Sequence, residues 1–379
     1  MIRVLLFGVS SGVGGIETFL MKHIEHMDLN EIKFELLCNT EHPAFEETWL
    51  KMGIPVYKVS PRSKHPVRFH KELKDFFEQH KGQYDVFWCN KCMLTNIDFL
   101  KVAKKYHIPV RIIHSHNSAL MDVGLKGILM RFLHERGRKQ IASYATDFWA
   151  CSDFAAKWFY SDEMIESNHY QFIPNAVDVD KFCYKPEVRK AYREQLGIQD
   201  QFVIGHVGRF HQQKNHMFLL DIFHEVQKKC PDSVLLLIGT GELQSVVKER
   251  VKQLGLEKKV QFLGVRDDVS EIMQAMDCFL LPSLYEGLPV VAVEAQAAGL
   301  PCYLAADGIT KQARLLENSK FLSLSDDVQK WAETILQTDV EKRTDTRLQI
   351  VEKGFEIKAA ARNLQKQLIS MALENERNV

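Results

Sequence analysis

The sequence predicts an α/β protein of two doubly wound domains, each built on a parallel sheet with helices on both faces. Three observations lead to this fold class. The chain has 379 residues, which exceeds one ordinary hydrophobic core and suits two domains of similar size. Short, fully apolar runs alternate with segments of helical period, the pattern of buried parallel strands. This alternation breaks off near the middle of the chain and then begins again.

The first domain is expected over residues 1–178. It opens with an apolar strand at 2–9, a glycine-rich loop and an amphipathic helix at 16–27. Later strands are expected at 34–38, 56–59, 86–88, 110–113 and 147–150. A connection at 173–178 contains proline and asparagine and ends the pattern.

The second domain is expected over residues 179–354. Its strands are expected at 202–207, 234–238, 260–263, 278–281 and 301–304. The segment 355–375 predicts a long helix with no strand after it. Because open parallel sheets bind ligands at the carboxyl ends of their strands, two such sheets are expected to face a ligand-binding cleft.

The composition is that of an ordinary soluble globular protein, with 46% hydrophobic and 26% charged residues. Forty-nine basic residues balance forty-nine acidic ones, so no nucleic-acid partner is predicted. Eight scattered cysteines, most of them in apolar runs, indicate reduced thiols in a cytoplasmic protein. No uncharged run approaches the roughly 18 residues of a membrane helix, and the apolar start is too short for a signal peptide.

A basic excess lies within the first half of the chain. Nine basic residues between positions 101 and 139 are opposed only by Asp122 and Glu135, and seven more lie between positions 58 and 81. Solvated helix faces explain any one of these residues. Together they would attract anionic lipid headgroups or a lipid diphosphate, so peripheral contact with a membrane surface is kept as a hypothesis.

The first glycine-rich loop follows the first strand and includes Gly14 and Gly15. Its position is that of a dinucleotide-binding loop. The third glycine of that fingerprint would fall at Glu17, however, whose carboxylate would repel a pyrophosphate. A glycine turn that lets a ligand approach the backbone and a purely geometric turn both stay open.

Loops after the strands of the second domain carry candidate anion-binding residues. Gly208, Arg209 and Lys214 follow the strand 202–207, where two cations can neutralise a diphosphate, although solvated loop cations are the alternative. Two further loops that follow strands are weak evidence for a binding site when each is taken alone. They contain Gly241 after the strand 234–238, and Val265 and Arg266 after the strand 260–263.

The strongest signal is the stretch from 281 to 295. A strand ends before a loop that carries Glu286, Gly287 and Leu288, and Pro289 is placed to start a helix. Glu294 falls early in that apolar helix, where a carboxylate is costly unless ribose hydroxyls or a structural arginine satisfy it. Glu286 would accept hydrogen bonds from sugar hydroxyls, and the helix amides would hold phosphate oxygens.

These motifs resemble the retaining family-4 glycosyltransferases. Glu286 and Glu294 are separated by seven residues, the E-x7-E pattern of that family, within the wording Tyr-Glu-Gly-Leu-Pro at 285–289. Gly208, Arg209 and Lys214 are similar to the family's diphosphate clamp. The segments 14–18 and 174–178 look like its N-terminal loop and its interdomain connection, so the similarity covers the whole chain in order.

The resemblance implies the GT-B fold, two Rossmann-like domains with the donor bound to the second domain and the acceptor to the first. It also implies that the final helix crosses back onto the first domain. By the same resemblance, Arg209 and Lys214 stabilise the departing diphosphate, Glu294 holds the ribose and Glu286 positions the donor sugar. The expected donor contacts are Gly15, Gly208, Arg209, Lys214, Gly241, Val265, Arg266, Glu286, Gly287, Leu288 and Glu294.

The same resemblance implies that the sugar is transferred with retention of anomeric configuration and without a metal or other cofactor. The family's active-site histidine is placed at His116, with His114 as the second candidate, and the acceptor is expected at Gly14, Gly15 and His116. The wording resembles capsule and exopolysaccharide enzymes, whose acceptors are saccharides or polyprenyl-diphosphate-linked sugars. A UDP-linked donor is favoured over a GDP-linked one.

Three other functions and three possible metal-binding motifs are alternatives to this interpretation. A nucleotide-sugar epimerase and an inactive nucleotide-sugar-binding homologue stay open, whereas a dinucleotide-dependent dehydrogenase fails at Glu17. No metal site is predicted. The discounted motifs are the pair Cys89 and Cys92, the pair His114 and His116, and the pair Asp178 and Asp180.

Overall fold

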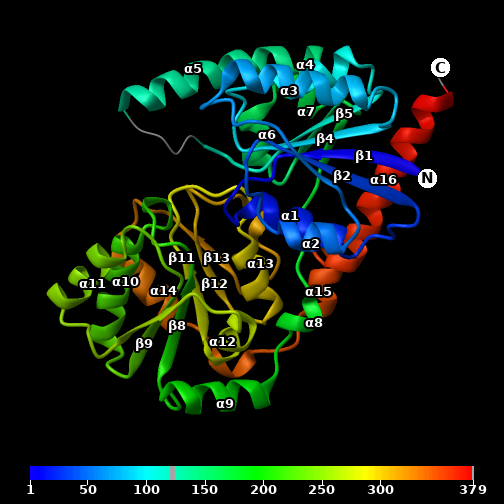
Figure 1. Cartoon of the computed structure of the whole chain (residues 1–379). Coiled ribbons are helices and arrows are strands. Elements are labelled where there is room, and N and C mark those ends of the chain that lie inside the picture. The colour runs from blue at the N-terminus through cyan, green and yellow to red at the C-terminus, as the bar shows by residue number, and fades with distance from the viewer. Residues whose placement is uncertain (120–123, 378–379) are drawn as a thin grey trace. The chain divides into compact units, whose positions relative to one another are not determined.

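The computed structural model of the chain describes residues 1–119 and 124–377 (Figure 1). Asp122, one of the two acidic residues that oppose the basic stretch, lies outside these ranges. The chain divides into two compact units, one of Met1–Asn175 with Ile357–Val379 and one of Ala176–Glu356. We call them unit 1 and unit 2.

Unit 1 contains a seven-stranded parallel sheet in the order β3-β2-β1-β4-β5-β6-β7. The strands are β1 Ile2–Phe7, β2 Ile32–Cys38, β3 Val56–Lys58, β4 Val86–Lys91, β5 Val110–Ser115, β6 Asp147–Ala150 and β7 Tyr170–Phe172. The helices are α1 Gly15–Ile24, α2 Glu46–Lys51, α3 Pro66–Gln79, α4 Asp98–Lys105, α5 Gly124–Gln140, α6 Asp153–Phe159, α7 Asp162–Ile165 and α16 Ile357–Arg377.

Both faces of this sheet are buried, and alternate residues of β1 show how. Val4 and Leu6 join a core formed with α1, α2 and α16, to which α16 contributes Leu364. Leu5 and Phe7 join a second core on the opposite face, formed with α3, α4 and α6. This two-sided burial is the reason that the strands are continuous apolar runs.

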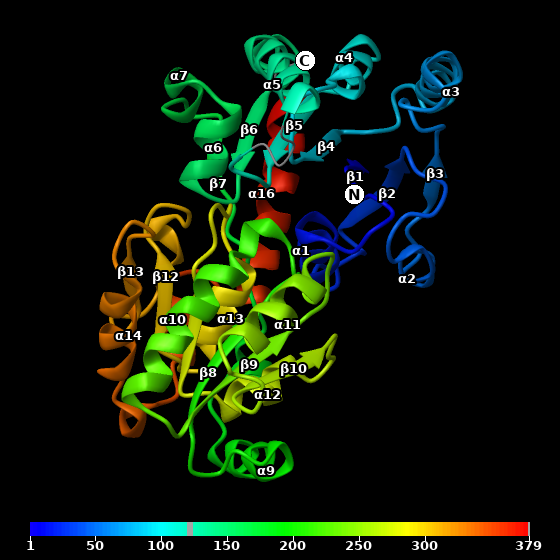
Figure 2. The same ribbon diagram turned by 90° about the vertical axis from the view of Figure 1, so that its left-hand side faces the viewer.

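Unit 2 contains a six-stranded parallel sheet in the order β10-β9-β8-β11-β12-β13. The strands are β8 Phe202–Val207, β9 Ser233–Ile238, β10 Val260–Gly264, β11 Cys278–Leu281, β12 Cys302–Ala305 and β13 Lys320–Leu322. The helices are α8 Val179–Phe182, α9 Pro186–Leu196, α10 His216–Lys229, α11 Gln244–Gln253, α12 Val269–Ala275, α13 Val290–Ala297, α14 Val328–Leu336 and α15 Arg347–Glu352. Figure 2 shows the same units turned by 90°.

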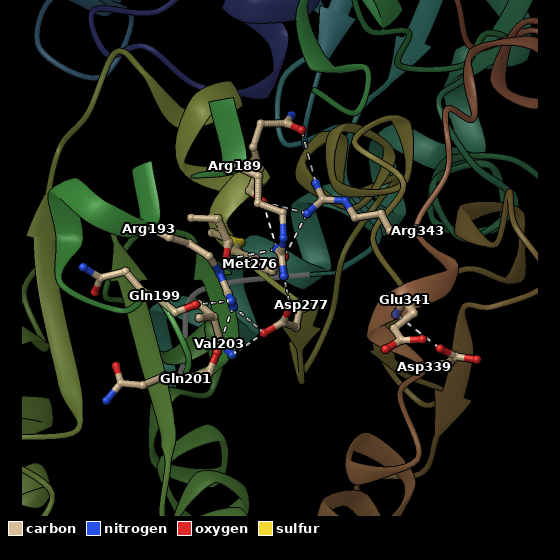
Figure 3. Close-up of polar contacts among 12 residues, drawn as sticks. Arg189, Arg193, Gln199, Gln201, Val203, Met276, Asp277, Asp339, Glu341 and Arg343 are labelled. Carbon is tan, nitrogen blue, oxygen red and sulfur yellow. Dashed lines mark hydrogen bonds and ion pairs between the residues drawn. The ribbon is translucent and has the colours of Figure 1, made fainter. Parts of the chain in front are cut away.

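An arginine cluster ties the helices of unit 2 to the amino end of its sheet (Figure 3). Asp277, just before β11, accepts hydrogen bonds from Arg189 and Arg193 of α9 and from the amide of Val203 in β8. Arg343 donates to carbonyls at the end of α12, and burial lowers the pKa of this guanidinium to about 9. These side chains hold helices and strands together at the sheet edge opposite to the loops that follow the strands.

The prediction of two doubly wound parallel sheets is confirmed. The three-residue edge strands β7 and β13 were not predicted, because neither is a continuous apolar run. Unit 1 ends at Asn175 rather than at residue 178, and α16 begins at Ile357 rather than at 355. The two connecting segments pair with each other, since the Val177 amide donates to the Phe355 carbonyl at 2.9 Å.

Candidate functional site

The loops after β8 and β11 meet at the centre of the carboxyl edge of the unit 2 sheet. β8 and β11 are hydrogen-bonded neighbours although they are far apart in sequence. The sheet grows in one direction from β8 to β9 and in the other from β11 to β12, so the loops at this point diverge. Such a switch point is where open parallel sheets bind ligands.

Lys214 and Glu286 form an ion pair across this switch point. The Lys214 Nζ lies 2.6 Å from the Glu286 Oε1, and both side chains are largely buried, with exposed fractions of 15% and 10%. The Gln213 side chain donates to the Tyr285 carbonyl at 2.8 Å, and the Glu286 amide donates to the Gly308 carbonyl at 2.7 Å. The structure therefore brings together two of the residues that the sequence predicts in one site.

Arg209 lies in the same loop as Lys214 but differs from it in its surroundings. Its side chain is exposed, and its guanidinium makes no hydrogen bond or ion pair with any residue in 1–119 or 124–377. A free arginine fork beside a paired lysine leaves one cation ready for an anionic ligand and another held in place.

Close packing of the loops explains two of the predicted glycines. A Cβ on Gly208 would lie 3.1 Å from side-chain carbons of Lys214, and a Cβ on Gly241 would lie 2.5 Å from the Phe210 carbonyl oxygen. A larger residue at 241 would displace the Phe210 backbone, whereas one at 208 would need a small shift of the Lys214 or His206 side chain. Packing within the loops is thus sufficient to require glycine at 241, and it leaves little room beside Lys214 at 208.

Two buried histidines beneath Lys214 were not predicted. The rings of His206 in β8 and His216 at the start of α10 lie 4.8 Å apart between centroids, and His216 stacks on Phe210 at 4.3 Å. Burial, and after it the charge of Lys214, lowers the pKa of His216 to about 4, and burial holds the pKa of His206 well below its usual range. Both therefore stay neutral near pH 7. The sequence gave no signal for His206 within the apolar run of β8, or for His216 at the start of α10.

Other predicted donor residues of unit 2 lie in the loop after β11 and in α13, the helix that follows it. Glu294 is half-buried in α13, between the buried Val293 and Ala295. Gly287 is half-buried and Leu288 is buried in the loop ahead of α13. Pro289 is the amino-terminal cap of that helix, one position before its first residue, Val290.

The loop after β10 carries Val265 and Arg266. Val265 is 75% exposed. Arg266 forms a two-pronged contact with Asp268, which also accepts a hydrogen bond from the Tyr192 hydroxyl. The structure thus gives Arg266 a local partner and does not link it to Lys214 or Glu286.

A separate hollow of about 340 Å³ lies at the carboxyl edge of the unit 1 sheet. Its lining includes Gly14, the amino-terminal cap of α1, and Gly15, the first residue of that helix. Asn39, Asn90 and Lys91 line it from the ends of β2 and β4. Two predicted acceptor residues therefore lie in a hollow with polar side chains.

Glu17 closes the glycine loop of unit 1. Its carboxylate accepts hydrogen bonds from the amide and the hydroxyl of Ser10, both at 2.8 Å, and from the Gly14 amide at 3.0 Å. Amides that a pyrophosphate would use in a dinucleotide-binding loop are thus already taken by a negative group. This geometry is the physical reason that the loop does not suit a dinucleotide.

The two candidate histidines occupy different environments. His114 is fully buried within β5, and neither ring nitrogen has a hydrogen-bond partner in the described parts of the chain. His116 follows the strand, and its Nε2 donates to the Asn90 Oδ1 at 2.8 Å. Burial, with a smaller effect of His23, lowers the pKa of His116 to about 3, so this ring is neutral and its Nδ1 is left as an acceptor.

Asn90 and Lys91 were missed because β4 extends beyond the predicted end at residue 88. Lys91 is half-buried, with its ammonium 5.3 Å from the centre of the Phe7 ring. Burial lowers the pKa of Lys91, and no carboxylate among residues 1–119 and 124–377 forms an ion pair with it. A cation without a partner in a hollow favours an anionic ligand.

The residues of the discounted metal motifs hold structural positions. Asp178 caps α8 by accepting hydrogen bonds from the amides of Asp180 and Lys181. Cys89 is buried, and burial raises its pKa to about 12. Over the described ranges, no group of three or more histidine, cysteine or carboxylate side chains is placed to hold a metal ion. Likewise, none of the helices in these ranges is both long enough and apolar enough to cross a bilayer.

Two family models match consecutive parts of the chain. One, described as Glycosyltransferase Family 4, matches residues 13–181, and the other, described as Glycosyl transferases group 1, matches residues 188–356. Their boundary falls close to the connection between units 1 and 2. Together the two models leave only short parts of the chain unmatched.

Curated relatives and solved structures agree with these matches. The chain is 33% identical to the glycosyltransferase EpsF of Bacillus subtilis, over 85% of this chain and 84% of that one. It is also 33% identical to an Escherichia coli UDP-Gal:alpha-D-GlcNAc-diphosphoundecaprenol alpha-1,3-galactosyltransferase, over 77% and 76%. The Anabaena protein HepE, solved with UDP, superposes with a TM-score of 0.71 at 21% identity, covering 100% of this chain and 99% of that one.

Proposed function

The chain belongs to the family-4 glycosyltransferases of the GT-B type, and from that premise we propose that it transfers a sugar with retention of configuration in surface polysaccharide synthesis. The proposed donor is a UDP-linked hexose or N-acetylhexosamine. The proposed acceptor is a saccharide, most simply one carried on a polyprenyl diphosphate as in the Escherichia coli relative. Unit 2 would bind the donor and unit 1 the acceptor.

The observation that carries the proposal is the buried Lys214–Glu286 pair at the switch point of the unit 2 sheet. A nucleotide diphosphate offers Lys214 a second anionic partner. When the diphosphate binds there, Glu286 can turn its oxygens to the sugar hydroxyls. The exposed guanidinium of Arg209 adds a two-pronged contact to the same diphosphate.

The chemical step follows from this charge arrangement. The bond between the anomeric carbon and the diphosphate oxygen breaks, and the acceptor hydroxyl oxygen bonds to that carbon on the same face. The hydroxyl proton passes to the departing diphosphate. Negative charge grows on the leaving group during this step, so fixed cations stabilise the transition state more than the bound donor. We propose that Arg209 and Lys214 do this without a metal or other cofactor.

On the acceptor side, His116 is proposed to act as a neutral hydrogen-bond acceptor. The Asn90 contact holds its tautomer and leaves Nδ1 available for a sugar hydroxyl. Glu294 is proposed to hold the ribose. The free thiols and the lipid-linked acceptor support a further proposal, that the enzyme works in the cytoplasm against the inner face of the cell membrane.

The test measures acceptor-dependent release of UDP from a panel of nucleotide sugars, with membrane lipid extract as the acceptor source. Lys214→Ala is expected to lower the rate about a hundred- to thousandfold, and Glu286→Gln is expected to lower it strongly as well. Matched controls are Lys252→Ala and Glu249→Gln on the exposed face of α11, which should leave the rate unchanged. Treatment with a chelator should also leave it unchanged.

Three outcomes would overturn the proposal. Epimerised donor formed without any acceptor would identify an epimerase. Full activity in both Lys214→Ala and Glu286→Gln would show that the ion pair is not part of the machinery. Binding of UDP-sugar without turnover over the whole panel would favour an inactive homologue.

A further inference from the structure

The histidine of strand β8 places one edge of its ring beside the Lys214 side chain. A Cβ on Gly208 would lie 3.1 Å from the His206 Nε2, and also 3.1 Å from both the Cδ and the Cε of Lys214. The glycine therefore lets this ring nitrogen and the end of the lysine stem approach one point in space. The ammonium that is paired with Glu286 lies one bond beyond that stem.

The hydrogen bond at the other edge of the ring fixes which nitrogen of His206 carries the proton. Nδ1 lies 2.9 Å from the Leu280 carbonyl oxygen, which can only accept, so Nδ1 is the donor. Burial holds the pKa of His206 well below its usual range, so the ring is neutral and its Nε2 keeps a lone pair. This nitrogen is buried, and it has no hydrogen-bond partner among the residues that the structure describes. His206 therefore presents a hydrogen-bond acceptor beside Lys214.

Packing fixes the direction of this acceptor. The fully buried His206 ring lies parallel to the Phe279 ring of β11, with centroids 6.4 Å apart, and at 78° to the His216 ring, with centroids 4.8 Å apart. Turning the ring over would remove the hydrogen bond to Leu280 and leave that buried carbonyl with one donor fewer. Nε2 is thus held toward the loop that carries Lys214.

Lys214 has donors to spare for this acceptor. An ammonium carries three N–H groups, and the Glu286 Oε1 takes one of them at 2.6 Å. In the proposed function, the donor diphosphate attracts Lys214 and Glu286 turns its oxygens to the sugar hydroxyls. The ammonium then loses its buried protein partner at the stage when its position matters most. A buried acceptor without a donor is costly, so a group of this kind is explained by a donor that reaches it during the reaction.

We propose that His206 is a positioning residue for Lys214, whose ammonium donates a hydrogen bond to the His206 Nε2 when the donor diphosphate is bound. A neutral nitrogen suits this task better than a carboxylate, because it directs the ammonium without cancelling the positive charge that faces the diphosphate. The inference rests on the proposed function of the Lys214–Glu286 pair, and it adds the group that supports the lysine once Glu286 has turned away.

The first test measures acceptor-dependent UDP release by variants of His206. His206→Phe keeps a ring of similar size and removes Nε2, so kcat is expected to fall about tenfold or more, the loss of one hydrogen bond to a charged group. The KM for the donor should stay within about twofold, since the contact acts mainly in the transition state. His206→Gln offers an amide oxygen as acceptor and should recover most of the rate. An equal loss of kcat in both variants would contradict an acceptor role.

A double-mutant cycle shows whether His206 acts through Lys214. In the Lys214→Ala background, His206→Phe should cause no further loss, because the group that it positions is gone. Losses that multiply would overturn the inference. The matched control is His216→Phe, a buried ring that stacks on Phe210 and whose nitrogens make no hydrogen bond within the described ranges, and it should leave kcat unchanged. A loss equal to that of His206→Phe would assign the effect to packing beneath the loop.

A measurement on the wild type covers the case in which His206→Phe does not fold. Histidine 15N NMR spectra are recorded without and with saturating UDP, and the His206 signals are assigned from the His206→Gln variant. The Nδ1–H tautomer should be present in both states. The Nε2 signal should move to lower chemical shift when UDP binds, which is the direction for a lone pair that accepts a hydrogen bond. An Nε2 signal that UDP leaves in place would overturn the inference.

The same variants separate this inference from the proposed function. A large loss of rate in Lys214→Ala, together with an independent effect of His206→Phe, would contradict the positioning role and leave the proposed function intact. Full activity in Lys214→Ala would contradict the proposed function itself.

Discussion

Single residues decide how the two candidate sites differ in charge. In unit 2 the Lys214 ammonium already has a carboxylate partner, so a ligand must compete with Glu286 for it. In unit 1 the Lys91 ammonium forms no ion pair within the described ranges and is partly shielded from water. A paired cation can exchange one anion for another with little net change in charge, whereas an unpaired one gains most from an anionic ligand.

Replacing Lys91 by methionine tests this difference. The substitution keeps most of the side-chain volume and removes the charge, so the fold should be retained. We expect the KM for a diphosphate-linked acceptor to rise about tenfold, the loss of one charge-assisted contact, with the KM for the donor unchanged. Steady-state kinetics with each substrate varied in turn give both values. Lys71→Met on the exposed face of α3 is the control, and an unchanged acceptor KM would contradict the assignment.

Several site residues were predictable from the sequence because each stands beside a recognisable strand end. Glu286 and Lys214 are examples, since parallel strands bring their loops to one edge. His206 and Asn90 were not predictable, because their roles arise from partners far away in sequence or from a strand longer than its apolar run. His216 was not predictable either, because its ring packs on His206 and Phe210 only once the loop after β8 has folded. Arg266 is a residue whose predicted donor contact stays a prediction, and its partner in the structure is the neighbouring Asp268.

Elements differ in how strongly their surroundings hold them. α5 is fixed through a narrow inner face, where Gly137 touches the backbone of Leu94 and His134 bonds to it. The long apolar strands were predicted because burial on both sheet faces leaves a clear pattern, whereas β7 and β13 contain no continuous apolar run. The direction that the apolar side chains of α5 face could not be predicted from the sequence, since apolar spacing alone does not say which way a helix faces.

Gly137→Ala tests how α5 is held. An added Cβ would lie 2.0 Å from the Leu94 carbonyl oxygen, so the helix must shift, and we expect the free energy of unfolding to fall by about 1–3 kcal/mol. Gly12→Ala is the control, because nothing lies within 4 Å of the Cβ it would add. Urea unfolding monitored by circular dichroism compares the two. Equal stability of the Gly137→Ala variant and the wild type would show that α5 can move away from Leu94 at no cost.

At the scale of the whole molecule, both units bury neutral histidines. Burial lowers the pKa values of His23 and His116 in unit 1 to about 4 and about 3, and the pKa of His216 in unit 2 to about 4. The unfolded chain would titrate the same groups near pH 6.5. Below that pH the unfolded state takes up protons that the native state does not, so stability is lost on acidification and is full above about pH 7.

We therefore expect the free energy of unfolding to fall as the pH is lowered from about 6.5 to about 4, by up to about 1.4 kcal/mol per pH unit for each of these histidines. Urea midpoints measured at pH 7 and pH 5 would show it. His216→Phe should reduce the pH dependence, since it removes one titrating group from under Lys214. Midpoints that do not change between the two pH values would contradict the buried, neutral state of these rings.

The helix α16 has a consequence for the order in which the protein is made. Its residues Ala361, Leu364 and Leu368 complete the core beneath the first strand, Ile2–Phe7. The ribosome synthesises all of Ala176–Glu356 between that strand and this helix. Unit 2 has every residue it needs before α16 exists, whereas the nascent unit 1 must wait with one sheet face uncovered. The later-synthesised unit can therefore finish folding first, and the uncovered face is the surface on which a chaperone would act.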